Sequence, residues 1–101
     1  MDIALRAIAE PHRREMLRLV LSRELSAGEI AARFDITRSA VSQHLRALEH
    51  AGLVTVRKDG TRRLYRARPE GLADLRSFLE DFWTDRLWRL KMAAEAEERR
   101  S

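Results

Sequence analysis

The sequence predicts a mainly α-helical domain that carries one small β-hairpin. Apolar residues recur at helical spacing over most of the 101 residues. The spacing changes to that of strands in LVTVRKDGTRRLYRAR, residues 53–68, which contains the common hairpin turn Asp59-Gly60. A chain of this length with an apolar content of 45% suits one modest hydrophobic core. We therefore expect a single domain over residues 1–101.

Two helices are expected at the start of the chain. The first covers about residues 2–9 and begins at Asp2. Pro11 is typical of the first turn of a helix, where its missing N–H costs no hydrogen bond. The second helix is expected to begin there and to run to about Leu21.

Two further helices are expected to form a helix-turn-helix over about residues 27–51. Ser26 and Glu29 have the spacing of a capping box, which predicts that the third helix begins after Ser26. Thr37 is placed to cap the fourth helix, which is expected to end near His50.

The hairpin over about residues 53–68 is the expected wing of this helix-turn-helix, and Pro69 and Glu70 open a last helix. That helix, about residues 70–96, carries more large apolar residues than one small core can cover. We expect it to pair, together with the helix over about residues 2–9, with a second copy related by a twofold axis. The expected dimer interface consists of Ile3, Leu5, Ile8, Leu75, Phe78, Leu79, Phe82, Trp83, Leu87 and Leu90.

This apolar face has two alternative roles that stay open. One is that of a helix lying on a membrane surface, although acidic residues interrupt the apolar stripe and would repel anionic lipid. Those acidic residues are Asp74, Glu80, Asp81 and Asp85. The second alternative is a ligand pocket between the aromatic residues.

The fourth helix carries an unusual polar face. At about 100° per residue, Val41, Leu45 and Leu48 fall on one side of it. The opposite side presents Ser39, Ser42, Gln43 and Arg46. A merely solvated face favours Glu and Lys, whereas Arg, Gln and Ser contact guanine, adenine and phosphate in a major groove. Thr37 and Arg38 lie at the helix start, the end that enters the groove. The pattern predicts DNA recognition, although such a face also arises by chance.

The hairpin is rich in basic residues. If Asp59-Gly60 forms a two-residue turn, Arg57 lies opposite Arg62 and Val54 lies opposite Tyr65. Like charges directly opposite each other are destabilising, so this pairing favours a phosphate backbone alongside. A solvated basic hairpin with a longer loop and a shifted register is the alternative. We expect DNA backbone contacts from Thr37, Arg46, Arg57, Lys58, Arg62 and Arg63.

The composition excludes several kinds of protein. Without cysteine, the chain has no disulfide, thiolate nucleophile or Cys-bound metal. No apolar stretch is long enough to span a bilayer, and the first residues do not resemble a secretory signal, so we expect a cytoplasmic protein without a membrane partner. The sequence has no Gly-rich phosphate loop and no carboxylate–histidine pattern, so we expect no enzymatic activity. A formal net charge of +4 suits a polyanionic partner.

Three segments carry a family resemblance: EPHRREMLRLV, SAVSQHLRALEHAGLV and GTRRLYRA. They resemble, in that order, the opening-helix motif, the recognition-helix signature and the wing of the ArsR/SmtB family of winged helix-turn-helix repressors, with Glu10 in place of an aspartate. The resemblance covers nearly the whole chain. It implies a homodimer that binds an inverted-repeat operator in double-stranded DNA, represses transcription and, in many members, regulates its own gene. It also implies base contacts from Arg38, Ser39, Ser42 and Gln43.

The resemblance does not extend to the metal-binding motifs of the family. Metal-sensing members carry a Cys-x-Cys pair at the third helix, where this chain has Ser26 and Gly28. Other members place Asp and His ligands on the last helix, and this chain has no histidine after His50. Because borderline metals need clustered Cys or His, we expect no metal site and no cofactor. The sequence identifies no effector.

The histidines favour structural roles. His44 is expected to pack with one ring nitrogen hydrogen-bonded rather than to contact a base. His12, Arg13 and Arg14 are expected to pair with acidic neighbours such as Glu10.

Two further classes of function stay open. One is a winged-helix module that binds a protein partner and no DNA. The second is an RNA-binding protein, which the shortage of stacking aromatic residues disfavours.

Overall fold

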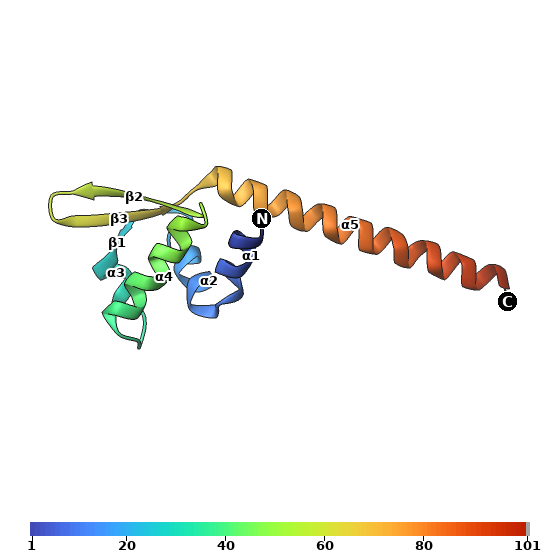
Figure 1. Cartoon of the computed structure of the whole chain (residues 1–101), viewed down its shortest axis with the longest axis horizontal. Helices are drawn as coiled ribbons and strands as arrows, with labels where there is room; N and C mark the ends of the chain where they lie inside the picture. The colour runs from blue at the N-terminus through green and yellow to red at the C-terminus, as the bar shows by residue number, and fades with distance from the viewer. Residues whose placement is uncertain (101) are drawn as a thin grey trace.

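Within residues 1–100, which the computed structural model describes, a long C-terminal helix extends from a small domain of helices and strands (Figure 1). The elements are α1 (Asp2–Ala9), α2 (Pro11–Leu19), β1 (Leu25–Ser26), α3 (Ala27–Ala31), α4 (Arg38–His50), β2 (Val54–Asp59), β3 (Arg62–Ala67) and α5 (Pro69–Arg100). The predicted fold class, a mainly helical winged helix-turn-helix with a long last helix, is confirmed. Ser101, the last residue of the expected domain, lies outside the described residues.

Helix caps fix where the helix-turn-helix begins and turns. The expected capping box is present: Glu29 N–H donates to the Ser26 hydroxyl at 3.1 Å, and Ser26 N–H donates to the Glu29 carboxylate at 3.0 Å. The Thr37 hydroxyl accepts from Ala40 N–H at 3.0 Å and so caps α4. Both helices therefore start where the sequence predicts.

The wing is a three-stranded antiparallel sheet with strand order β1-β3-β2. The sequence pattern did not predict β1, since a strand of two residues has no readable alternation. Leu25 pairs with Tyr65, and Ser26 pairs with Leu64. This pairing ties the start of α3 to the wing, because Ser26 is both a strand residue and the cap of α3.

The predicted register of the hairpin is wrong by two residues. Arg57 pairs with Leu64 rather than with Arg62, and Asp59 pairs with Arg62. The loop therefore consists of Gly60 and Thr61, and Gly60 has a φ of 64°, a left-handed conformation that favours glycine. Opposite charges, Asp59 and Arg62, therefore meet at the ends of the strands, and the like charges Lys58 and Arg63 pair one position further along.

The core lies between the helical layer and the inner face of the sheet. The predicted apolar face of α4 is confirmed, because Val41, Leu45 and Leu48 are all buried. Met16 and Ile30 of the preceding helices are fully buried against the same cluster. Because this face of α4 is buried, the opposite face of the helix is exposed to solvent.

Two glycines bring the start of α5 against the end of α4. Gly52 has a φ of 75°, and a Cβ built on Gly71 would lie 1.9 Å from the Gly52 carbonyl oxygen. Only glycine at position 71 permits this contact between two backbones. Leu75 follows one turn later and is the buried residue of α5.

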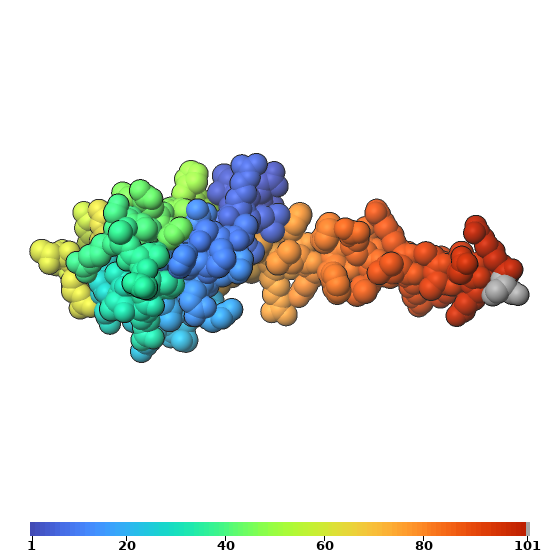
Figure 2. Space-filling model, turned by 90° about the horizontal axis from the view of Figure 1, so that it is seen from below, coloured from blue at the N-terminus to red at the C-terminus, as the bar shows by residue number. Residues whose placement is uncertain are grey.

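Beyond Leu75, α5 leaves the domain and extends as an exposed rod (Figure 2). The molecule measures 68 × 27 × 21 Å as a result. None of its helices within the described residues combines the length and apolarity needed to cross a membrane.

Candidate nucleic-acid interface

The polar face of α4 is open to solvent. The side chains expected to contact bases or phosphate from this helix are all exposed: Arg38, Ser39, Ser42, Gln43 and Arg46. No acidic side chain within the described residues forms an ion pair with any of them. An exposed helix face with hydroxyl, amide and guanidinium groups can donate and accept hydrogen bonds without first breaking internal ones.

Arg38 lies at the junction between α4, α3 and the wing. A Cβ built on Gly28 of α3 would lie 3.1 Å from Nη2 of Arg38, so the arginine lies against that glycine. Arg38, Arg62 and Arg63 all line one surface cleft of about 400 Å³, together with Thr61 and Ser26. Three arginines around one cleft favour an anion such as a phosphate there, although Arg62 also donates to Glu29 at 2.9 Å.

Two arginines of the wing have carboxylate partners within the protein. Arg57 donates to Glu24 through Nε at 2.8 Å and through Nη2 at 2.7 Å. Arg62 donates to Glu29 at 2.9 Å. The expected like-charge pair of Arg57 and Arg62 is therefore wrong, since each guanidinium has its own acid.

These contacts change the acidity of the carboxyl groups. Hydrogen bonds from Arg57 hold the pKa of Glu24 below its usual value, although burial acts in the opposite direction. The backbone N–H of Ser26 lowers the pKa of Glu29, and Arg62 adds to that effect. Both carboxylates are ionised at neutral pH and offset part of the positive charge of the wing.

Other cations of this surface have no such partner. Within the described residues, Lys58 and Arg63 form no ion pair, and both are exposed near the tip of the wing. Thr37 is exposed beside the start of α4, where its hydroxyl oxygen accepts from Ala40 and its proton stays available. The structure thus brings the expected phosphate-contacting residues to the side of the domain that carries α4 and the wing.

The expected dimer face has a continuous exposed apolar part on α5. The residues from 40% to 66% exposed are Phe78, Leu79, Phe82, Trp83, Leu87 and Leu90, together with Ile3 of α1. Leu5 and Ile8 are partly buried against the domain core. Leu75 is only 6% exposed and packs within its own chain, so it offers almost no surface to a partner.

The comparisons with known proteins agree with this geometry. Residues 10–56 match the model of the family described as "Bacterial regulatory protein, arsR family". The chain is also 45% identical over 83 residues to the HTH-type transcriptional regulator Rv2034 of Mycobacterium tuberculosis, an alignment covering 82% of this chain and 78% of that protein. This chain belongs to the arsR family. It is a DNA-binding transcriptional regulator and not an enzyme.

The relatives of this arsR-family protein include both a transcriptional activator and a transcriptional repressor. The transcriptional activator HlyU of Vibrio cholerae is 42% identical over 57 residues, which is 56% of this chain and 53% of HlyU. The transcriptional repressor SdpR of Bacillus subtilis is 33% identical over 60 residues, which is 59% of this chain and 67% of SdpR.

Solved structures of the family share the fold. A possible transcriptional regulator for arsenical resistance superposes with a TM-score of 0.78 at 52% identity, covering 86% of this chain and 91% of that one. The homodimeric winged helix-turn-helix DNA-binding domain Mb0332 of Mycobacterium bovis gives a TM-score of 0.67 at 28% identity, covering 83% of this chain and 78% of that one.

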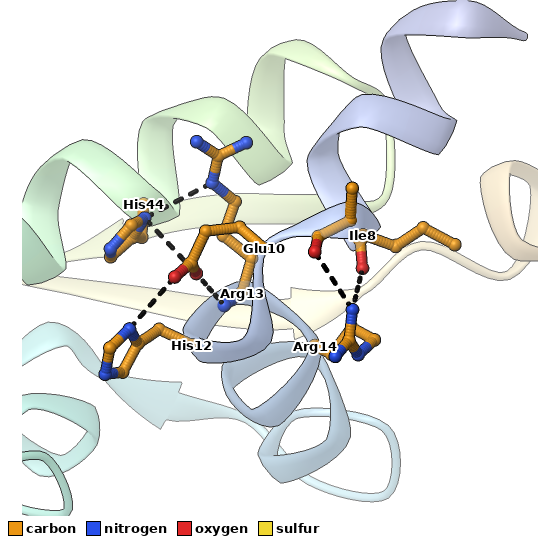
Figure 3. Close-up of polar contacts among 7 residues, drawn as sticks. Ile8, Glu10, His12, Arg13, Arg14 and His44 are labelled. Atoms are coloured by element: carbon orange, nitrogen blue, oxygen red, sulfur yellow. Dashed lines mark hydrogen bonds and ion pairs between the residues drawn. The ribbon is translucent and has the colours of Figure 1, made fainter.

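This arsR-family chain also contains a cluster that the sequence pattern did not predict (Figure 3). Glu10, which precedes α2, lies between His12 of α2 and His44 of α4. The predicted packing of His44 is confirmed, since its Nδ1 accepts from Nε of Arg13 at 3.2 Å. The predicted pairing of His12 with Glu10 is confirmed at 3.0 Å. Arg14 instead donates to backbone carbonyls at the end of α1.

No spacing rule could reveal this cluster, because His12 and His44 come from different helices far apart in the sequence. We expected no metal site because the family's metal ligands on the third and last helices are missing, and these three residues lie elsewhere. The three side chains could together hold a metal ion.

Proposed function

We propose that this regulator is a homodimeric repressor that binds an inverted-repeat operator, including one at its own gene. The observation that carries the proposal is the division of α4 into a buried apolar face and an exposed face with Arg38, Ser39, Ser42 and Gln43. These four side chains read base edges in the major groove, where arginine suits guanine and glutamine suits adenine.

The wing and the start of α4 hold the phosphate backbone. Lys58, Arg63 and Arg46 supply unpaired positive charge, and Thr37 adds a hydroxyl donor. Arg62 contributes through the cleft that it shares with Arg38 and Arg63. Arg57 contributes less, because two of its guanidinium nitrogens, Nε and Nη2, already donate to Glu24.

Two chains pair through α1 and the middle of α5. A monomer would leave a row of large apolar side chains along α5 exposed to water. Two copies that pair along α5 bury these side chains against each other. The proposed interface consists of Ile3, Leu5, Ile8, Phe78, Leu79, Phe82, Trp83, Leu87 and Leu90. The homodimeric Mb0332 domain supports this arrangement. A twofold axis then presents two α4 helices about 34–36 Å apart, one helical turn of DNA.

Repression follows from occupancy, since a protein that covers promoter DNA excludes RNA polymerase. A named repressor among the relatives supports this direction, and a named activator marks the alternative. A regulator that acts on a bacterial chromosome works in the cytoplasm, which is the location that we propose.

The experiment is selection of bound duplexes from a random pool, followed by fluorescence anisotropy and transcription in vitro on the selected sequence. We expect the selection to enrich an inverted repeat, the anisotropy titration to give two chains per duplex, and added protein to reduce the amount of transcript. More transcript would identify an activator. A winged-helix module that binds only a protein partner would retain no duplex, and that result would overturn the proposal.

A further inference from the structure

The cluster of Glu10, His12 and His44 lies on the side of α4 that faces α2, away from the face assigned to DNA (Figure 3). Nδ1 of His12 lies 3.0 Å from one carboxylate oxygen of Glu10, and Nδ1 of His44 lies 3.9 Å from the other. One ligand atom from each residue falls within 4.8 Å of the others. All three residues are partly buried.

We propose that Glu10, His12 and His44 form a binding site for a divalent cation of the borderline class, such as Zn²⁺, Co²⁺ or Ni²⁺. Two imidazole nitrogens and one carboxylate oxygen are the ligand set that these ions take, whereas Mg²⁺ and Ca²⁺ prefer oxygen alone.

The spacing suits such an ion after a small adjustment. Tetrahedral ligands at a zinc–nitrogen distance of about 2.0–2.1 Å lie roughly 3.4 Å from each other. The separations from Glu10 to the two histidine nitrogens, 3.0 and 3.9 Å, lie on either side of that value. Because His12 and Glu10 are also exposed in part, water completes the coordination.

Two neighbours shape the site. The backbone N–H of Arg13 donates to Glu10 at 2.9 Å and holds the carboxylate in place at the start of α2. Nε of Arg13 donates a hydrogen bond to Nδ1 of His44. The guanidinium of Arg13 must therefore move aside when the ion binds that nitrogen. Phe34 contacts the ring of His12 from the edge and limits its rotation.

Occupancy of this site would join the start of α2 to the recognition helix. His44 directly follows Gln43, so a change in its position changes the presentation of a side chain assigned to base reading. This coupling to DNA rests on the proposed function, whereas cation binding does not.

The test is calorimetric titration of the full-length, EDTA-treated protein with ZnCl₂, without DNA. The wild type is expected to bind one Zn²⁺ per chain with saturation. The variants His12→Gln and His44→Gln are expected to weaken binding by at least about tenfold, since even partners of metal ligands typically contribute that much. The matched control is His50→Gln, an exposed histidine on the same helix, and it is expected to bind as the wild type does.

A second measurement separates loss of a ligand from loss of the fold. At one fixed concentration, Zn²⁺ should raise the midpoint of thermal unfolding for the wild type and for His50→Gln by more than for His12→Gln, because a ligand stabilises a fold in proportion to how tightly that fold binds it. Titration without saturation would overturn the proposal, as would equal Zn²⁺ affinity in the wild type and in both ligand variants. If Zn²⁺ binds as expected and DNA affinity does not respond, the site stands and the coupling fails.

Discussion

Arg57 donates two hydrogen bonds to the carboxylate of Glu24, at 2.8 and 2.7 Å. A cation of the wing therefore forms an ion pair with an acid from the segment before β1. Arg62 likewise donates to a carboxylate, that of Glu29 in α3, through a single hydrogen bond. The protein therefore displays less positive charge on its wing than the sequence indicates. The strength of its phosphate contacts depends on acids as well as on arginines.

The variant Glu24→Gln should bind DNA of any sequence more tightly. Without the carboxylate, Arg57 is free to contact a phosphate, and each added contact steepens the dependence of log K on log salt by about 0.9. Fluorescence anisotropy over a series of salt concentrations measures both quantities. Glu15→Gln removes the same charge from an exposed pair with Arg18 on α2 and serves as the control. Equal effects of the two variants would show that only net charge matters.

Gln43→Ala should relax the preference for one base pair in each half-site and cost roughly 1–3 kcal/mol on the selected operator. Arg63→Ala, in contrast, should weaken binding to all duplexes about equally and flatten the salt dependence, because a phosphate contact carries no sequence information. Competition between operator and scrambled duplexes distinguishes the two results. If both variants lost affinity without regard to sequence, the assignment of roles would be wrong.

Phe82→Asp should convert the proposed dimer into a monomer that keeps its fold. Phe82 is 52% exposed within one chain, and its ring contacts Phe78 and the guanidinium of Arg86, both on the same helix, so its loss leaves the domain core intact. Sedimentation velocity and circular dichroism measure the two properties. Thr84→Asp places the same charge two residues away on the same helix and should stay dimeric. A dimeric Phe82→Asp protein would exclude this stretch of α5 from the interface.

Gly71→Ala should destabilise the protein, although alanine is the better helix former by about 1 kcal/mol. The added Cβ would lie 1.9 Å from the Gly52 carbonyl oxygen, and a backbone cannot move aside as a flexible side chain can. Urea unfolding measures the change in free energy. A gain in stability would mean that α5 does not pack on the end of α4 in this way.

The free energy of unfolding should decrease in acid. The folded-state pKa of Glu29 lies below its unfolded value of 4.5, so its stabilising contribution is present above that value and is lost as the pH falls through the folded-state pKa. Urea unfolding at about pH 7 and about pH 3.5 covers the range in which carboxyl groups titrate. Glu29→Gln should lose less stability between these two pH values. An equal loss in variant and wild type would contradict the assigned hydrogen bonds.

Local patterns were sufficient to predict the helix-turn-helix. Each cap, at Ser26 and at Thr37, involves residues only three positions apart, and Val41, Leu45 and Leu48 repeat at intervals of three or four. The structure confirms the caps and the buried face. The side chains proposed to read bases follow from the same periodicity, since a helix with one buried face exposes the other.

Features that depend on distant contacts were not predictable. Asp59-Gly60 predicts a turn, but the strand register depends on whether Gly60 is the first or the second residue of the loop. In the observed register, Tyr65 pairs with Leu25 on one side and with Val56 on the other. The acid partners of Arg57 and Arg62 come from residues 33 positions earlier in the chain. Leu75 looked like an interface residue because its helical stripe continues into Phe78 without a break.

Methylation protection of guanine N7 on the selected operator tests the proposed dimer and its two recognition helices directly, because that atom lies in the major groove. We expect protection in two clusters whose centres lie about 10–10.5 base pairs apart, and loss of both clusters with Phe82→Asp. Protection of a single cluster, or none on a duplex that is nevertheless bound, would contradict a dimer that presents two α4 helices to successive major grooves.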